Sequence, residues 1–426
     1  MRTVTLLTGH NDTLVTFQSK CDHLSKICVV LLALSIPIST MGTSILLMAL
    51  LALWLLGGNL LQKLREIYNH PVSRIVFFLF SIFAIGALYS PAPLYDISSM
   101  LSKMGRLLYI PLLLPSFKEE KWRRLTIGAL VAATALTVIL SFIQCYLGHS
   151  VFETRVSFMR RSRVFSNFNT SSCVFKDDIF TNFMMALASF IIGHAILLYK
   201  NTAIRTALFI LLAAIVFYMF FISYGRTGQI IFVSLWMLFG FQRLKTQQFL
   251  GLILALTLTL VSIALYSPHF QKRVIEIQED IQQYQMGNHR TSMGERYEFA
   301  TQTLALIKDH PWMGYGTGSF KKIYGEHAQT HHLTPSVNPH NEYLNILFQV
   351  GGVGLALILG LFFALVRQTS YLPDIERWLA QGLLLSMGIG CLANSWFMDR
   401  TSSILFVVML ACCFGALPPH QRKSAS

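Results

Sequence analysis

The side chain best suited to proton transfer is His340, in the run Asn338-Pro339-His340-Asn341-Glu342. Asparagine is favoured at the N-cap of a helix and proline at its first position, so the run predicts a helix that begins at Pro339, with His340 second. The positive end of a helix dipole disfavours imidazolium and lowers the pKa of the ring. A neutral imidazole can accept a proton from a hydroxyl group. His340 is therefore interpreted either as a general base or as a polar residue that caps the helix.

A first candidate for phosphate binding is Arg226, which lies in a short polar interruption between two apolar runs, residues 223–228. Gly225 and Gly228 would let the backbone turn tightly there. A guanidinium group held between two membrane-spanning helices could bind a phosphate through two hydrogen bonds. The alternative is an arginine that caps a helix end and extends its charge to the membrane surface.

A second candidate for phosphate binding is Arg296, which follows Gly294 and Glu295. The apolar spacing downstream predicts an amphipathic helix from Arg296 to Ile307. The alternative is an ion pair between Arg296 and Glu295 or Glu298, which would contribute little at a surface.

Three alternate glycines, Gly314, Gly316 and Gly318, lie in the run from His310 to Phe320. They predict a tight loop with an exposed backbone. The loop is not a P-loop, because no Gly-Lys-Ser/Thr follows. A turn with a structural role is favoured here over a phosphate cradle.

Neither a metal site nor a cofactor is predicted. His327, His331 and His332 form only a loose cluster, because adjacent histidines usually point apart. Asp177 and Asp178 are more simply interpreted as residues that stabilise the start of the following helix.

The composition of the chain is typical of a membrane protein. Of its 426 residues, 54% are hydrophobic and 13% are charged. Several apolar runs approach or exceed the ~20 residues that a helix needs to cross a bilayer, and open sheets cannot span lipid. The net charge of +14 is more typical of cytoplasmic loops that face anionic lipid than of nucleic-acid binding, for which no motif is present. The fold class is predicted to be an all-α integral membrane protein.

About twelve transmembrane helices are predicted, with one large polar loop between the ninth and the tenth. Nine helices fall within residues 1–266, the loop occupies 267–340, and three helices fall within 341–426. The span at 104–116 contains Pro111 and Pro115, so it is expected to be broken or re-entrant. The predicted bounds are 24–41, 43–60, 72–89, 104–116, 125–147, 178–199, 203–223, 227–242, 247–266, 341–366, 376–397 and 401–417.

The short loops that carry most lysines and arginines are expected in the cytoplasm, together with both termini. The loop at 267–340 then lies on the outer face. Four arginines of another outer loop oppose this charge rule, and they are interpreted either as a solvated loop or as a basic surface that attracts an anionic lipid-linked substrate. These arginines are Arg155, Arg160, Arg161 and Arg163. The predicted span centres contain almost no ionisable groups, which argues against an ion-coupled transporter.

Three motifs carry a resemblance to a known family. They are Gly294-Glu295-Arg296, the glycine-rich run from His310 to Phe320, and Pro339-His340-Asn341-Glu342-Tyr343-Leu344 followed by the run from Gln349 to Gly354. With these motifs and a large outer loop, the chain resembles the O-antigen ligase and O-antigen polymerase superfamily. The resemblance covers roughly residues 205–365 by motif and the rest by the pattern of spans.

The resemblance implies a glycosyltransferase C-like membrane fold in the bacterial inner membrane, with the active site on the periplasmic face. It implies a metal-independent, inverting transfer of a glycan from undecaprenyl pyrophosphate to an acceptor sugar, which is lipid A–core oligosaccharide for a ligase. The family histidine matches His340, and the two phosphate-binding arginines match Arg226 and Arg296. A ligase is the favoured interpretation, because there is one main outer loop of modest size and a basic outer surface. The alternatives are an O-antigen polymerase, a protein O-oligosaccharyltransferase and a non-enzymatic solute transporter.

Overall fold

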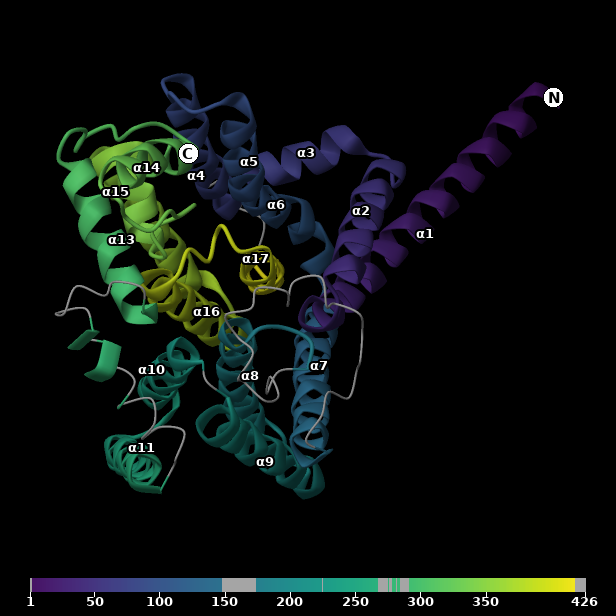
Figure 1. The fold of residues 1–426 in the computed structure, drawn as a ribbon. Coiled ribbons are helices and arrows are strands. Elements are labelled where there is room, and N and C mark those ends of the chain that lie inside the picture. Colours follow the sequence, from purple (N-terminus) through teal and green to yellow (C-terminus); the bar gives the residue numbers. More distant parts are fainter. Residues whose placement is uncertain are drawn as a thin grey trace, which may run out of the picture. The chain divides into compact units, whose positions relative to one another are not determined.

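The computed structural model describes residues 2–147, 174–223, 225–266 and 291–417, with a few residues between 275 and 283 (Figure 1). Within these ranges the regular structure is helical throughout, with no strand. The all-α prediction is therefore confirmed for the described part of the chain. The predicted outer arginines Arg155, Arg160, Arg161 and Arg163 lie outside the described residues.

Seven described helices are long and apolar enough to cross a membrane, or eight if a bent pair counts as one span. The bent pair is α2 (Thr40–Leu56) and α3 (Leu60–Asn69), and the chain direction bends by 113° between them. The predicted span at 104–116 is broken into short pieces, of which α6 (Tyr109–Leu113) is the longest. Proline removes a backbone donor and clashes with the preceding turn, so Pro111 and Pro115 explain this break. A multi-pass helical protein is confirmed, whereas a total of twelve spans stays a prediction.

The chain forms two compact units, and each is described by itself. Unit 1 consists of residues 1–36, 40–127 and 278–426, and unit 2 consists of residues 37–39 and 128–277. In unit 1, α15 packs against α4 and α13, and α17 packs against α6 and α16. The green helices of Figure 1 are α13, α14 and α15, and both α13 and α14 contact α15. The helices of unit 1 not yet given are α1 (Arg2–Ile38), α4 (Pro71–Leu88), α5 (Leu94–Gly105), the start of α7 (Glu120–Leu147), α13 (Ser292–Ile307), α14 (Phe320–Thr330), α15 (Glu342–Gln368), α16 (Asp374–Ala393) and α17 (Arg400–Phe414).

Unit 2 is organised around one buried helix. It contains the rest of α7, α8 (Asp178–Leu198), α9 (Thr202–Phe217) with its π-helical end (Tyr218–Ile222), α10 (Arg226–Arg243) and α11 (Thr246–Tyr266). Most of α8 is buried, and its largest contact is with α10. A Cβ atom on Gly228 of α10 would lie 2.3 Å from Cβ of Asn182 on α8. The close approach of the two helices therefore requires glycine at this position.

The helix α15 is interrupted at Gly351, where φ is 67° and ψ is −174°. An unbroken helix would join the N–H of Gly352 to the carbonyl of Phe348, and the N–H of the next residue to the carbonyl of Gln349. Both bonds are replaced by bonds to the loop between α13 and α14. Gly352 donates to Pro311, and Phe348 accepts from Tyr315 at 2.9 Å. Because this loop satisfies the freed groups, a helix of membrane-spanning length can contain a break.

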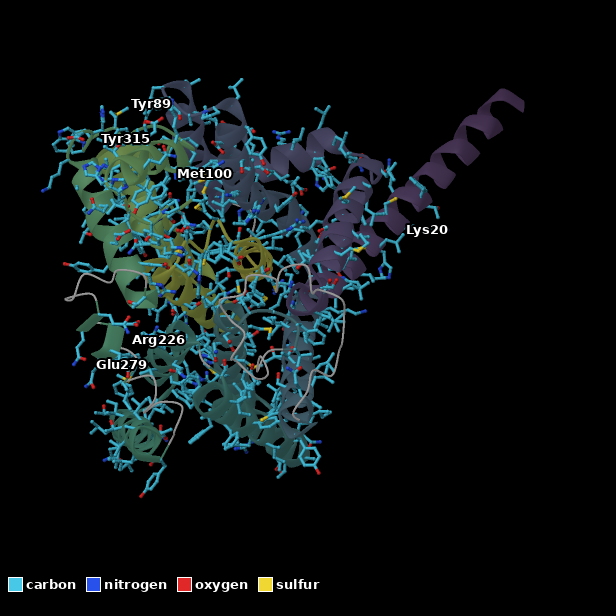
Figure 2. All side chains as sticks on the ribbon, in the orientation of Figure 1. Lys20, Tyr89, Met100, Arg226, Glu279 and Tyr315 are labelled. Atoms are coloured by element: carbon cyan, nitrogen blue, oxygen red, sulfur yellow. The ribbon has the colours of Figure 1, made fainter. Side chains whose placement is uncertain are left out.

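The same loop is fixed to the end of α4. The backbone N–H of Thr317 donates to the carbonyl of Gly86, and the Thr317 hydroxyl donates to the carbonyl of Phe83 at 2.7 Å. The Tyr89 hydroxyl donates to the carbonyl of Met313 at 2.6 Å. Figure 2 shows Tyr89, just after α4, and Tyr315, in the loop, at the same end of unit 1. The loop is thus held from α4 on one side and from α15 on the other.

Candidate functional site

His340 was expected at the second position of a helix, but it lies just outside that helix, which begins at Glu342. Its φ is 52°, and the N-cap of α15 is Asn341, whose side chain accepts from the N–H of Leu344. The side chain of Asn338 instead accepts from the N–H of His340 at 2.9 Å. This local turn competes with helix formation, so the prediction of a helix that begins at Pro339 is wrong by three residues.

The His340 ring is half-buried against α13. It stacks on the ring of Phe299, with centroids 5.7 Å apart and planes at 22°. Burial lowers the pKa of His340 below its ordinary value, and the positive charge of Arg296 lowers it further, while the hydrogen bond to Asn394 and the charge of Glu295 raise it. The predicted direction is confirmed, but the main cause is desolvation rather than a helix dipole. The ring is therefore mostly neutral at neutral pH.

Arg296 lies near His340 and is half-buried on α13. The helix begins at Ser292, four residues before the predicted start, and ends at Ile307 as predicted. None of the ion pairs formed among the described residues includes Arg296, so the alternative of a local pair with Glu295 or Glu298 finds no support. The carboxylate of Glu298 is buried and accepts from the N–H of Thr334 at 2.9 Å. Glu298 thus holds the loop that leads to His340.

A second loop, between α16 and α17, reaches His340 from 54 residues further along the chain. Oδ1 of Asn394 lies 3.3 Å from Nδ1 of His340. The hydroxyl of Ser395 donates to Oδ1 of Asn338 at 3.2 Å. Sequence reasoning missed both residues. The signal that could have found them is a polar pair between two apolar runs, Leu392-Ala393 and Trp396-Phe397.

A row of buried polar side chains leads from this site along α15. Glu342 accepts from the N–H of Phe397 at 3.1 Å and from the amide of Asn345 at 3.3 Å. Gln349 donates to Asn345 at 2.8 Å and accepts from the N–H of Gly318 at 2.7 Å. These residues are spaced three and four apart, so they share one face of the helix. The row therefore joins the loop after α16 to the glycine-rich loop.

The glycine-rich loop has a structural role. Gly314, Gly316 and Gly318 have φ of 68°, 90° and 81°, values that favour glycine. Every backbone N–H from Gly314 to Ser319 donates to a protein acceptor, namely His310, Phe348, Gln349, Gly86, the Gln349 side chain and Gly316 in turn. A phosphate cradle needs free N–H groups. The interpretation of this loop as a structural turn is therefore confirmed.

Arg226 is the first residue of α10 in unit 2, and its side chain is labelled in Figure 2. It follows a link of three residues after the π-helical end of α9, as the predicted short turn required. Gly225 has a φ of −79°, an ordinary value, so the reason for glycine here is not a tight turn. A Cβ on Gly225 would lie 2.2 Å from the amide nitrogen of Asn182. The two glycines bring the start of α10 against α8.

The start of α8 faces this same turn. Asp177 caps α8 by accepting from the N–H of Phe180, as predicted. Asp178 accepts from the hydroxyl of Ser223 at 2.9 Å, and that hydroxyl accepts from the amide of Asn182 at 2.5 Å. These bonds hold the residues just before Arg226 in place.

The loop histidines pair with protein groups. His327 and His331 have ring centroids 4.2 Å apart; Nε2 of His327 contacts Oε1 of Gln302 at 3.0 Å, and Nδ1 of His331 contacts the carbonyl of His327 at 3.0 Å. Within the described ranges, no three or more His, Cys, Asp or Glu side chains are arranged to hold a metal ion.

Two comparisons with known proteins bear on this site. Residues 208–359 match the family model described as O-antigen ligase, and this range contains Arg226, Arg296 and His340. A stretch of 88 residues is 34% identical to a protein described as O-antigen ligase from Salmonella typhimurium (strain LT2). That match covers 19% of this chain and 22% of the relative, less than two thirds of its length. Residues 208–359 are therefore similar to the O-antigen ligase family.

Proposed function

We propose that this chain is a membrane-bound O-antigen ligase, which transfers O-antigen polysaccharide from undecaprenyl pyrophosphate to lipid A–core oligosaccharide. The observation that carries the proposal is His340, a half-buried imidazole of lowered pKa next to Arg296, within the residues that match the family. The apolar helices support a reaction at a membrane, where a polyprenyl-linked donor and a lipid-linked acceptor can meet.

His340 is proposed as the general base. It accepts the proton of the acceptor hydroxyl while the hydroxyl oxygen attacks the anomeric carbon of the donor. The bond between this carbon and the pyrophosphate oxygen breaks on the opposite face, which inverts the configuration. Undecaprenyl pyrophosphate leaves with the bonding electron pair, and His340 then loses its proton to water.

Arg296 and Arg226 are proposed to bind the pyrophosphate. A leaving pyrophosphate gains negative charge, so catalysis requires charge neutralisation more than a proton donor. Guanidinium groups supply that charge without a metal ion or a cofactor. Arg155, Arg160, Arg161 and Arg163 are proposed as a basic surface that attracts the anionic donor or the phosphates of the acceptor.

The loop at 267–340 is proposed to lie in the periplasm, between helices of the inner membrane at 1–266 and 341–426. The support is the excess of lysine and arginine in the other short loops, which favours the cytoplasm for them and for both termini. The base and the arginines would then face the side where both lipid-linked substrates carry their sugars.

The proposal is tested by a lipopolysaccharide gel of a deletion strain, complemented with the wild-type chain or with His340→Ala. Loss of the whole O-antigen ladder, with accumulation of undecaprenyl-linked polymer, is expected for the deletion and for His340→Ala. A band with a single repeat unit would instead indicate a polymerase. Loss of glycan from a protein, with normal lipopolysaccharide, would indicate a protein O-oligosaccharyltransferase. Solute uptake that depends on the chain and survives His340→Ala would indicate a transporter.

A further inference from the structure

The His340 ring is held by an amide from a distant part of the chain. Nδ1 of His340 lies 3.3 Å from the side-chain oxygen of Asn394. A rotation of the asparagine side chain exchanges its oxygen and its nitrogen. A second contact is therefore needed to decide which of the two atoms faces His340. The backbone N–H of Ser395 supplies it, because it donates to the same Oδ1 at 3.0 Å. An N–H group donates only to an acceptor, so the atom that faces His340 is the oxygen.

This oxygen determines which tautomer of His340 is present. A neutral imidazole carries one hydrogen, and the nitrogen next to an acceptor must hold it. Nδ1 is therefore the donor, and Nε2 carries the lone pair. Among the described residues, the hydrogen bonds of the ring are confined to Nδ1. Nε2 is thus left to accept a proton from a substrate.

Asn394 is held in place by α16 and, through Ser395, by the loop that precedes α15. Its backbone N–H donates to the carbonyl of Gly390 at 3.1 Å, which continues α16 to this residue. Ser395 donates its hydroxyl to Asn338, and Asn338 accepts the N–H of His340. The ring and the backbone of His340 are therefore both tied to residues 394–395.

The same loop is anchored a second time. The buried carboxylate of Glu342 accepts from the N–H of Phe397 at 3.1 Å, and the buried ring of Trp396 covers Gly390, where a Cβ would lie 2.0 Å from it. These contacts hold the loop against α15 and α16. A rigid partner restricts the ring to one orientation more effectively than a mobile one.

We propose that Asn394 is a positioning residue, which holds His340 in the Nδ1-protonated tautomer and so presents Nε2 as the proton acceptor. The inference rests on the proposed function, since a base is needed only if a hydroxyl is to be deprotonated. Asn394 lies outside the residues that match the family, 208–359. The charged groups that act on the ring are Arg296 and Glu295 on α13, which have opposite signs. The hydrogen bond to Asn394 raises the pKa of His340, but a neutral amide stabilises imidazolium less than a carboxylate would, because it carries no negative charge.

Two substitutions at this position separate orientation from charge. Asn394→Leu removes the acceptor, so we expect kcat for glycan transfer to fall by about 10²-fold, with little change in the donor KM. Asn394→Asp keeps an oxygen for both N–H donors and adds a negative charge. Its activity should be retained at high pH, while the acid limb of the kcat/KM profile moves to higher pH. Asn69→Asp, on the exposed end of α3, is the matched control and should leave the profile unchanged.

The measurement is in vitro transfer by the purified full chain, from undecaprenyl-pyrophosphate-linked glycan to lipid A–core, across a range of pH. A wild-type kcat for Asn394→Leu, or an acid limb that does not move in Asn394→Asp, overturns the inference. If Asn394→Leu does not fold, Asn394→Asp alone decides. Transfer that survives His340→Ala would instead remove the proposed base itself. An inactive His340→Ala with unaffected Asn394 variants would overturn only the role of Asn394.

Discussion

Gly351 lies against the backbone of Trp312 so closely that a Cβ on this glycine would be 2.1 Å from the Trp312 carbonyl oxygen. The Trp312 carbonyl also accepts from the N–H of Val353 at 3.2 Å, one of the hydrogen bonds that replace the broken turn of α15. The break lies on α15, which begins two residues after His340, and the replacement loop follows α13, which carries Arg296. The two candidate site residues are therefore joined through one backbone arrangement.

Substitution of Gly351 should disrupt this arrangement. Alanine would be strained at a φ of 67° with an extended ψ, by about 1–3 kcal/mol, and its Cβ would also clash with Trp312. We expect Gly351→Ala to lower the free energy of unfolding and the yield of folded protein. The measurement is thermal unfolding of the purified chain in detergent.

The matched control for this substitution lies on the same helix. Apart from its chain neighbours and the backbone of its own helix, Gly360 has no described heavy atom within 4 Å of its ideal Cβ position. Gly360→Ala should be neutral or stabilising, because alanine is favoured over glycine in a helix. An equal loss of stability for both variants would show that the helix, and not the contact with Trp312, is sensitive to substitution.

Removal of the imidazole should abolish transfer. His340→Ala leaves no proton acceptor at the site, so the rate should fall by about 10²- to 10⁴-fold. The lipopolysaccharide ladder and in vitro transfer both measure this loss. His332→Ala removes an exposed histidine of the same segment and should retain activity. A normal ladder from a strain that carries only His340→Ala would contradict the assignment of the base.

The apolar runs predicted several helices almost to the residue. The predicted span at 178–199 is α8 at Asp178–Leu198, and the predicted span at 247–266 is α11 at Thr246–Tyr266. Such helices can be predicted because length and hydrophobicity are local properties of the sequence. The direction of the pKa shift of His340 was also correct, although burial replaces the helix dipole as its main cause.

The features that sequence reasoning missed depend on distant residues. The break in α15 is stable only because the loop at 311–316 supplies partners for the freed backbone groups. The start of α15 depends on which of two asparagines caps it. The side chain of Asn338 accepts from the N–H of His340, so Asn341 is the cap. Asn394 reaches His340 across 54 residues. None of these contacts leaves a periodic pattern in the sequence.

Arg226 should contribute to donor binding through both its charge and its planar shape. Arg226→Ala should lower kcat/KM for the donor by roughly 10- to 100-fold, the amount expected for a lost charge-assisted hydrogen bond. Arg226→Lys should restore only part of it, because an ammonium group cannot form two parallel bonds. Binding of undecaprenyl pyrophosphate to the purified chain measures the effect. Wild-type transfer by Arg226→Ala would exclude the phosphate role.

Transfer should not depend on a divalent metal ion. The proposed charge neutralisation comes from guanidinium groups, so addition of a chelator should leave the initial rate unchanged. The rate is measured before and after EDTA treatment of the purified chain. Inactivation that is reversed by a specific metal would contradict the proposal.

The pH dependence of transfer should report the interaction between Arg296 and His340. Neutral His340 is the active base, so activity should rise with pH through a His340 pKa that lies below its ordinary value. The positive charge of Arg296 lowers this pKa. Arg296→Gln removes the charge, so the pKa rises and the acid limb of the kcat/KM profile should move to higher pH. Arg296→Lys keeps the charge, so the acid limb of its kcat/KM profile should stay at the same pH as in the wild type, even if donor affinity falls. Equal shifts for Gln and Lys would show that Arg296 affects His340 through packing rather than through charge.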